Sequence, residues 1–189
     1  MTEPVILSGG GFSIRFQFFG DRIGHTIAAL EGEQTLPLAA SREGTADDLW
    51  PASPPLVEIN TQSAANGEVA MLVGRTTVGH WSLTVEFDAR RGSARFDVAC
   101  RILAPPDEGV RSLGSCYRTM IAPTAGPAGE PSRARLALGQ SVVELVGSVD
   151  EATAARLERD DDGLTIGPTC PLGDVPQTVR WAYTVERAG

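Results

Sequence analysis

Two neighbouring segments in the middle of the chain, residues 80–88 and 93–102, alternate strictly between apolar and polar side chains. A period of two is typical of strands with one buried and one solvated face, because successive side chains of a strand point to opposite sides. The four residues 89–92 join the segments, which predicts a hairpin with Asp88 opposite Ser93. That register forms one apolar row, in which Phe87 faces Ala94, Val85 faces Phe96, Leu83 faces Val98 and Trp81 faces Cys100.

The second face of this hairpin is polar and supports the same register. Glu86 lies opposite Arg95, Thr84 opposite Asp97 and His80 opposite Arg101. Opposite charges that face each other stabilise a strand pair. A slip of one residue would bury Glu86 and Asp97, so the pairing is strongly specified.

A second hairpin is predicted near the start of the chain. The run 12–18 places Phe12, Ile14, Phe16 and Phe18 on one face, and Gly20-Asp21 suits a two-residue turn into the run from Arg22. Pairing Phe19 with Arg22 sets Phe16 opposite His25. We therefore expect His25 on the apolar face, where burial would keep its imidazole neutral.

Further turn signals recur every 8 to 12 residues and predict more hairpins around Asn66-Gly67 and Gly139-Gln140. Residues 69–73 are apolar on both faces, which indicates a strand inside a sheet. Only in segment 148–163 do helix and strand compete. Ser148 followed by Glu151 resembles a capping box, but a turn at 160–163 favours a hairpin, which we prefer.

These patterns predict an all-β antiparallel fold of about ten strands, with at most one short helix. We expect a two-sheet sandwich that forms one domain over residues 1–189, and a closed β-barrel is the alternative. The Pro-, Gly- and Ala-rich stretch near 122–132 is expected to be an exposed, mobile loop.

Composition narrows the function classes. The net charge is -8, and all 16 basic residues are Arg, as expected from codon usage in a GC-rich bacterial genome. Such an acidic chain is not expected to bind nucleic acid or an anionic membrane. The first residues do not resemble a secretory signal and no apolar run is long enough to span a membrane, so we expect a cytoplasmic protein. Cys100, Cys116 and Cys170 are odd in number and lack metal-ligand spacing, so no disulfide framework, metal or cofactor is predicted.

Few side chains are candidates for a site, because no known catalytic motif occurs. His25, His80 and Glu86 are weak catalytic candidates, since His and carboxylate groups perform acid–base chemistry. Trp50, His80 and Arg101 are candidate ligand-binding residues. Trp50 lies in a Pro-rich loop, where its ring could seal the end of the fold or stack on a ligand.

Three functions are compatible with these residues. We prefer a non-catalytic binding or protein-interaction domain that takes an unknown protein or small molecule and could form a homo-oligomer. The first alternative is an enzyme acting on a carbohydrate or another small polar substrate, with His80 or His25 paired with Glu58, Glu86 or Asp97. The second is a closed barrel that carries an apolar ligand or haem, with His25 pointing into the cavity.

Overall fold

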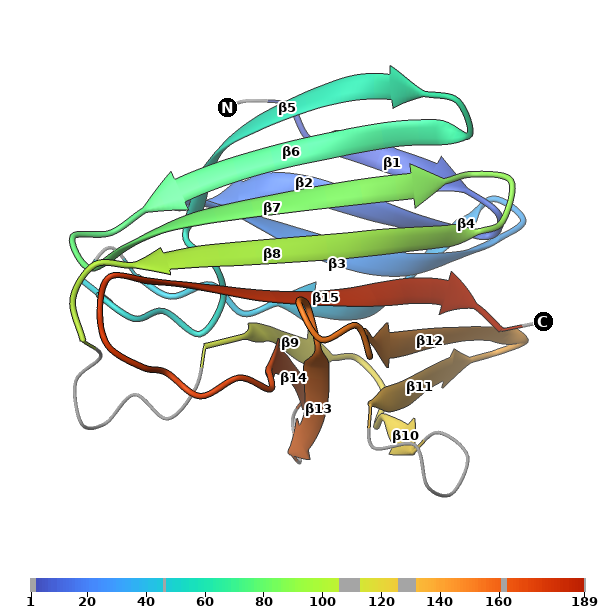
Figure 1. The fold of residues 1–189 in the computed structure, drawn as a ribbon. Helices are drawn as coiled ribbons and strands as arrows, with labels where there is room; N and C mark the ends of the chain where they lie inside the picture. Colours follow the sequence, from blue (N-terminus) through green and yellow to red (C-terminus); the bar gives the residue numbers. More distant parts are fainter. Residues whose placement is uncertain (1–2, 46, 106–112, 126–131, 161–162, 189) are drawn as a thin grey trace.

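The computed structural model describes all residues except 1–2, 46, 106–112, 126–131, 161–162 and 189. The described residues form fifteen strands and no helix, arranged as two antiparallel sheets that lie face to face (Figure 1). The seven-stranded sheet has the order β1 (Val5–Gly9), β2 (Phe12–Phe19), β3 (Arg22–Glu31), β4 (Gln34–Ser41), β9 (Ser115–Thr119), β14 (Gly163–Pro168) and β13 (Ala155–Asp160). The eight-stranded sheet has the order β10 (Thr124–Ala125), β11 (Arg133–Leu138), β12 (Ser141–Gly147), β15 (Gln177–Arg187), β8 (Ser93–Ile102), β7 (Gly79–Asp88), β6 (Gly67–Arg75) and β5 (Leu56–Ala64).

The fold is therefore an all-β sandwich, as the alternation predicts. The closed-barrel alternative is wrong, because the two sheets stay separate and each keeps its edge strands. The expected ten strands were too few, since several described strands are only two to six residues long and carry little periodicity.

The two hairpins derived from alternation have the predicted registers. Asp88 pairs with Ser93 and His80 with Arg101, and Phe19 pairs with Arg22. The inward row of the β7–β8 hairpin is buried, and β15 adds a further buried row beside β8. Phe18 is an exception and remains 44% exposed, because it lies next to the turn at the end of its hairpin.

The β5–β6 hairpin differs from its prediction in two ways. Its turn is Ala65-Asn66, one residue earlier than expected, because Ala64 pairs with Gly67. Strand β6 does lie inside the sheet, but its outer face is not covered. Met71 and Val73 on that face are 39% and 46% exposed.

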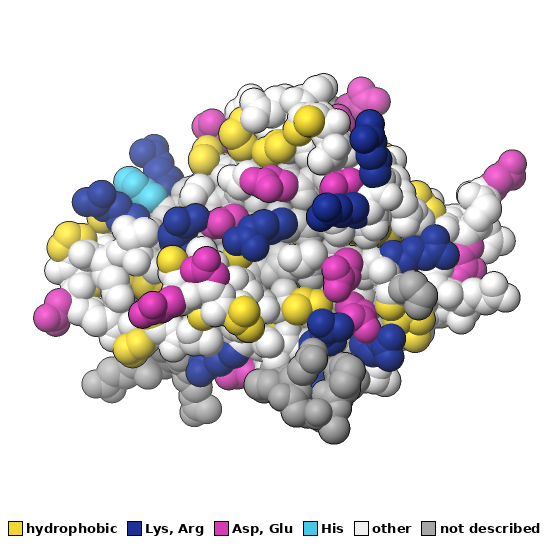
Figure 2. Space-filling view, turned by 45° about the vertical axis from the view of Figure 1, so that its right-hand side comes forward, with side chains coloured by type: hydrophobic (Ala, Val, Ile, Leu, Met, Phe, Trp, Pro, Cys, Tyr) yellow, Lys and Arg dark blue, Asp and Glu magenta, His cyan; other side chains and the backbone are white. Residues whose placement is uncertain are grey.

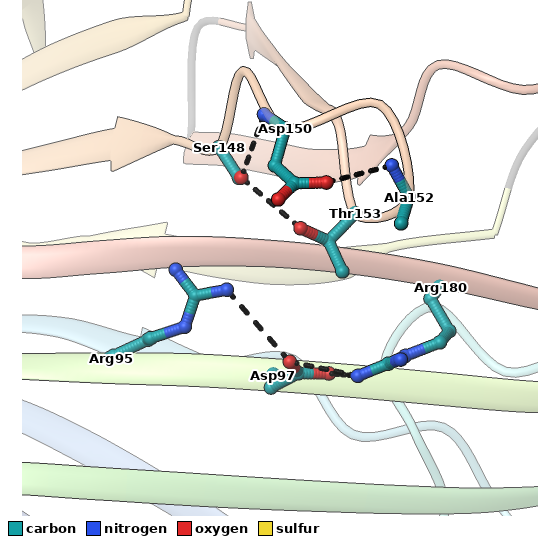
Figure 3. A network of polar contacts seen from close by, with 7 residues as sticks. All are labelled: Arg95, Asp97, Ser148, Asp150, Ala152, Thr153 and Arg180. Carbon is teal, nitrogen blue, oxygen red and sulfur yellow. Dashed lines mark hydrogen bonds and ion pairs between the residues drawn. The ribbon is translucent and has the colours of Figure 1, made fainter.

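Segment 148–163 contains no helix in its described residues. Instead, Ser148 Oγ accepts a hydrogen bond from the backbone N–H of Asp150, and Asp150 accepts one from Ala152 (Figure 3). This tight loop covers the outer face of β15, where Ala182 forms backbone hydrogen bonds with Ser148 and Thr153 and is fully buried. The loop leads into the β13–β14 hairpin, so the preference for a hairpin is confirmed.

The stretch near 122–132 is only partly described. Thr124–Ala125 form the short strand β10, whereas residues 126–131, which carry most of the expected mobile loop, lie outside the described residues. The tip of the turn at 160–163 also lies outside them.

Candidate functional site

Three basic side chains lie directly opposite one another across three neighbouring strands of the large sheet. Arg75 on β6 pairs with His80 on β7, which pairs with Arg101 on β8. All three are exposed on the outer face of the sheet. Side chains directly opposite each other are about 5 Å apart, so His80 lies between Arg75 on one side and Arg101 on the other. We call these three residues the basic row.

Further along this face, one carboxylate pairs with two arginines. Asp97 accepts hydrogen bonds from Arg180 at 2.9 and 3.0 Å and lies 3.9 Å from Arg95 (Figure 3). In the described part of the chain, by contrast, no ion pair or hydrogen bond involves the guanidinium of Arg75 or Arg101. Figure 2 shows the exposed histidine among arginine side chains at one end of the molecule. An acidic protein thus concentrates positive charge at this end.

Two adjoining hollows meet at Arg75 and His80, the members of the basic row on β6 and β7. One has a volume of about 540 Å³ and the other of about 620 Å³, and both are lined by Val57, Arg75 and His80. Exposed apolar side chains also line them, namely Leu49 (43% exposed), Val57 (40%), Val73 (46%) and Leu103 (42%). The hollows therefore combine arginine and histidine side chains with exposed apolar surface, and one carboxylate lines each of them, Asp21 the first and Glu58 the second.

A third arginine, Arg22 at the start of β3, lines the first hollow from within the fold. It is 3% exposed, and its Nη2 donates a hydrogen bond to the carbonyl of Thr45. Its Nη1 is buried without a hydrogen-bond partner, and Asp21 lies 3.9 Å from its Nε. Burial raises the pKa of the neighbouring Glu43 carboxyl to about 7, so this carboxyl neutralises Arg22 only in part near neutral pH.

Trp50 packs against the fold beside the hollows. Its ring makes an edge-on contact with Trp81, with centroids 6.1 Å apart and planes at 70°. The loop that carries it is held by a turn in which the N–H of Thr45 donates to Asp48 at 2.6 Å. Trp50 thus covers Trp81 at the end of the sandwich, and it is Trp81 that lines the second hollow.

His25 lies in the dry interior, on the apolar face as predicted. Its Nε2 shares a 2.7 Å hydrogen bond with the hydroxyl of Tyr117, which in turn contacts the hydroxyl of Tyr183 at 2.5 Å. Burial lowers the pKa of His25 to about 4 and raises that of Tyr117 well above its ordinary value. Because β3 and β9 belong to one sheet and β15 to the other, this chain of hydrogen bonds connects the two layers. With Phe16 and Phe96 against its ring, His25 packs among side chains and not into a barrel lumen.

The structure places His80 far from Glu86 and in the same hollow as Glu58. Glu86 lies six residues beyond His80 on the same strand, which corresponds to about 20 Å. It lines a different hollow of about 700 Å³ at the far end of the sheet, with Glu68, Asp88 and Arg95. Glu58, however, lines the second hollow together with His80. Of the candidate pairs with His80, only the one with Glu58 shares a hollow among the described residues.

Sequence reasoning missed Arg75 and Arg22. Arg75 could have been found by extending the register of the adjoining hairpin to its end, since the loop 76–78 is short. Arg22 carried no such signal, because its role depends on a loop more than twenty residues away.

The three cysteines lie in different environments. Cys100 is buried, Cys116 is half-buried and Cys170 is exposed. The described residues include no cluster of three or more His, Cys, Asp or Glu side chains that could hold a metal ion. Within the same residues, no helix is long and apolar enough to cross a membrane.

Comparison of the sequence with protein-family models and with curated proteins gives no match. Its function therefore has to be inferred from the geometry of the basic row and its hollows.

Proposed function

We propose that this chain is a non-catalytic binding domain whose ligand site is the basic row with its two hollows. The observation that carries the proposal is the direct cross-strand alignment of Arg75, His80 and Arg101. The alignment places two guanidinium groups, which form no ion pair within the described residues, on either side of His80, and a bound anion would accept hydrogen bonds from them.

The surroundings of the row define the chemistry of the ligand. Arginine binds carboxylates and phosphates through two parallel hydrogen bonds, which favours a ligand with such a group. The exposed side chains of Leu49, Val57, Val73 and Leu103 would contact an apolar portion next to the anionic group. The ligand that fits best is an organic anion, either a small molecule or the acidic and apolar side chains of a partner protein.

Phenyl phosphate, octanoate and inorganic phosphate are suitable probes, and tryptophan fluorescence can report binding because Trp81 lines a hollow. An Asp- and Leu-containing peptide distinguishes a protein partner from a small ligand. We expect the organic anions to bind more tightly than inorganic phosphate, and binding to weaken as salt is raised.

Arg75→Gln and Arg101→Gln should each weaken binding by about tenfold or more, as expected for the loss of a charge-assisted hydrogen bond. Arg91→Gln is the matched control, because its side chain is 84% exposed and lies in the β7–β8 turn at the opposite end of the strands. Equal weakening by Arg91→Gln, or no binding of any organic anion, would refute this assignment.

An enzyme acting on a carbohydrate or another small polar substrate is the second candidate, favoured by the shared hollow of Glu58 and His80. The two candidates differ in what a bound molecule undergoes. The binding domain should leave nitrophenyl glycosides and nitrophenyl esters intact, whereas an enzyme should cleave one of them and lose that activity in both His80→Ala and Glu58→Gln.

A further inference from the structure

Strand β5 is the outermost strand of the large sheet and has a free edge. In the described part of the chain it hydrogen-bonds only to β6, and Figure 1 shows it at the upper border of the molecule. It is nine residues long, and most of its side chains are exposed on both of its faces. Its outer edge therefore presents a row of backbone N–H and C=O groups that can pair with another strand.

The other three edge strands that the structure describes are poor templates for pairing. Strand β1 is five residues long and β10 only two. Strand β13 carries four charged residues among its six, as its sequence ARLERD shows. Short strands and charged side chains are the means by which proteins protect sheet edges.

Strand β5 lacks this protection. It contains one charged residue, Glu58, and no Arg or Pro. The only irregularity in its pairing with β6 lies between Leu56 and Glu58, so residues 59–64 form a regular edge. A long, regular and nearly uncharged edge is a predicted site of strand addition.

We propose that β5 pairs antiparallel with β5 of a second copy of this chain, so that two large sheets join across a two-fold axis. Antiparallel pairing of identical strands is self-complementary, which is the requirement of a symmetric dimer. With Asn60 opposite the same residue of the other copy, Glu58 lies opposite Gln62. The two carboxylates do not face each other, and the remaining directly opposed pairs are uncharged.

Charge also favours this edge over other surfaces. Two copies that each carry a net charge of -8 repel one another, so contact is least costly where charged residues are sparse. Charged residues make up 21% of the whole chain, but only one of the nine residues of β5.

The geometry also sets the strength and the consequences of the dimer. Nine residues a side is well below the roughly 20–30 of a standard interface, so the dimer should be weak and depend on concentration. Antiparallel pairing puts Val57 of each copy near the opposite end of the partner's strand. The two basic rows then lie at opposite ends of the joined edge. The pairing uses none of Arg75, His80 and Arg101, so this inference does not depend on the proposed function.

Sedimentation velocity from about 10 µM to about 1 mM, the range of a weak contact, tests the proposal. We expect the sedimentation coefficient to rise with concentration towards that of a dimer. In Asn60→Lys the two lysines of a dimer face each other, so the protein should stay monomeric over this range. Mixing Asn60→Lys with Asn60→Glu should restore the dimer, because opposite charges then meet at the axis.

Ser82→Lys is the matched control, because Ser82 is exposed on the outer face of β7, away from any edge. It should dimerise like the parent chain. A monomer at every concentration, a dimer that survives Asn60→Lys, or one that Ser82→Lys abolishes would each overturn the proposal. Circular dichroism of every variant confirms that it is folded before the result is read.

Discussion

The hydrogen-bonded chain between the sheets leads to a quantitative prediction for Tyr117→Phe. The substitution keeps the ring and removes only the hydroxyl, which bonds to both His25 and Tyr183. His25 is 6% exposed, so its Nε2 would lose its partner in a site that water does not reach. Tyr183 would lose one bond but keep Ser115 as a second partner. One orphaned buried group costs about 1–3 kcal/mol and one lost hydrogen bond about 1 kcal/mol, so we expect unfolding to become easier by about 2–4 kcal/mol.

Tyr183→Phe is the matched comparison. It also removes a single hydroxyl from the core, but Tyr117 keeps its bond to His25, so no buried ring nitrogen is orphaned. The expected loss is about 1–2 kcal/mol, because the hydroxyl of Tyr183 gives up its bonds to Tyr117 and Ser115. In the double variant the hydroxyl pair is already absent, so the two effects should not add.

Urea unfolding followed by tryptophan fluorescence measures both free energies, since Trp181 is fully buried in the same interior. The slope of the free energy against urea should stay constant, so that the midpoint alone reports the change. A Tyr117→Phe variant as stable as Tyr183→Phe would refute the reasoning, because it would mean that Nε2 of His25 loses nothing with the Tyr117 hydroxyl.

Two further predictions concern pH and chain packing. Burial lowers the pKa of His25 from 6.5 to about 4, so acidification across this interval protonates only the unfolded chain and removes stability. Burial raises the pKa of Glu43 from 4.5 to about 7, so its contribution is instead lost as the pH rises, and the two effects oppose each other between pH 4.5 and 6.5. Glu43→Gln should therefore make the urea midpoint fall more steeply than in the parent as the pH is lowered from 6.5 to 4.5, and an unchanged pH profile would contradict this. Gly74→Ala should cost about 1–3 kcal/mol in the same assay, because its Cβ would collide with the carbonyl oxygen of Pro55, whereas Gly173→Ala meets only ordinary contacts and should be neutral.

The β7–β8 and β2–β3 hairpins were predictable because the residues that specify each register lie within the hairpin itself. In the β7–β8 hairpin, alternation and a short connection together specify one register, and burial of the wrong face penalises every other. The same reasoning placed His25 among apolar side chains and His80 opposite Arg101, both of which the structure shows. It was less accurate at the expected Asn66-Gly67 turn, which is shifted by one residue. The actual turn residues are Ala65 and Asn66, and neither has the positive φ that an Asn-Gly hairpin turn requires.

The candidate site was only half predictable. His80 and Arg101 belong to one hairpin, but Arg75 adds a third strand, and Arg22 arrives from the other sheet. The partner of His80 in any acid–base chemistry also depends on three-dimensional proximity. Glu86 is on the same strand and yet distant, whereas Glu58 comes from a different hairpin and lines the same hollow.

By itself, the sequence determined the strictly alternating strand segments, the pairing within their hairpins and the inward side of the β7–β8 hairpin. The tertiary structure alone decided that β15 lies between β12 and β8 and that β4 meets β9. It also decided that Tyr117 reaches His25 across 92 residues, and that Tyr183 from the other sheet bonds to Tyr117 across a further 66. Pairing between neighbouring strands is encoded in alternation and turn residues, which act over a few positions. The order of distant strands depends on how all the apolar faces can be buried at once, and no short stretch of the chain carries that information.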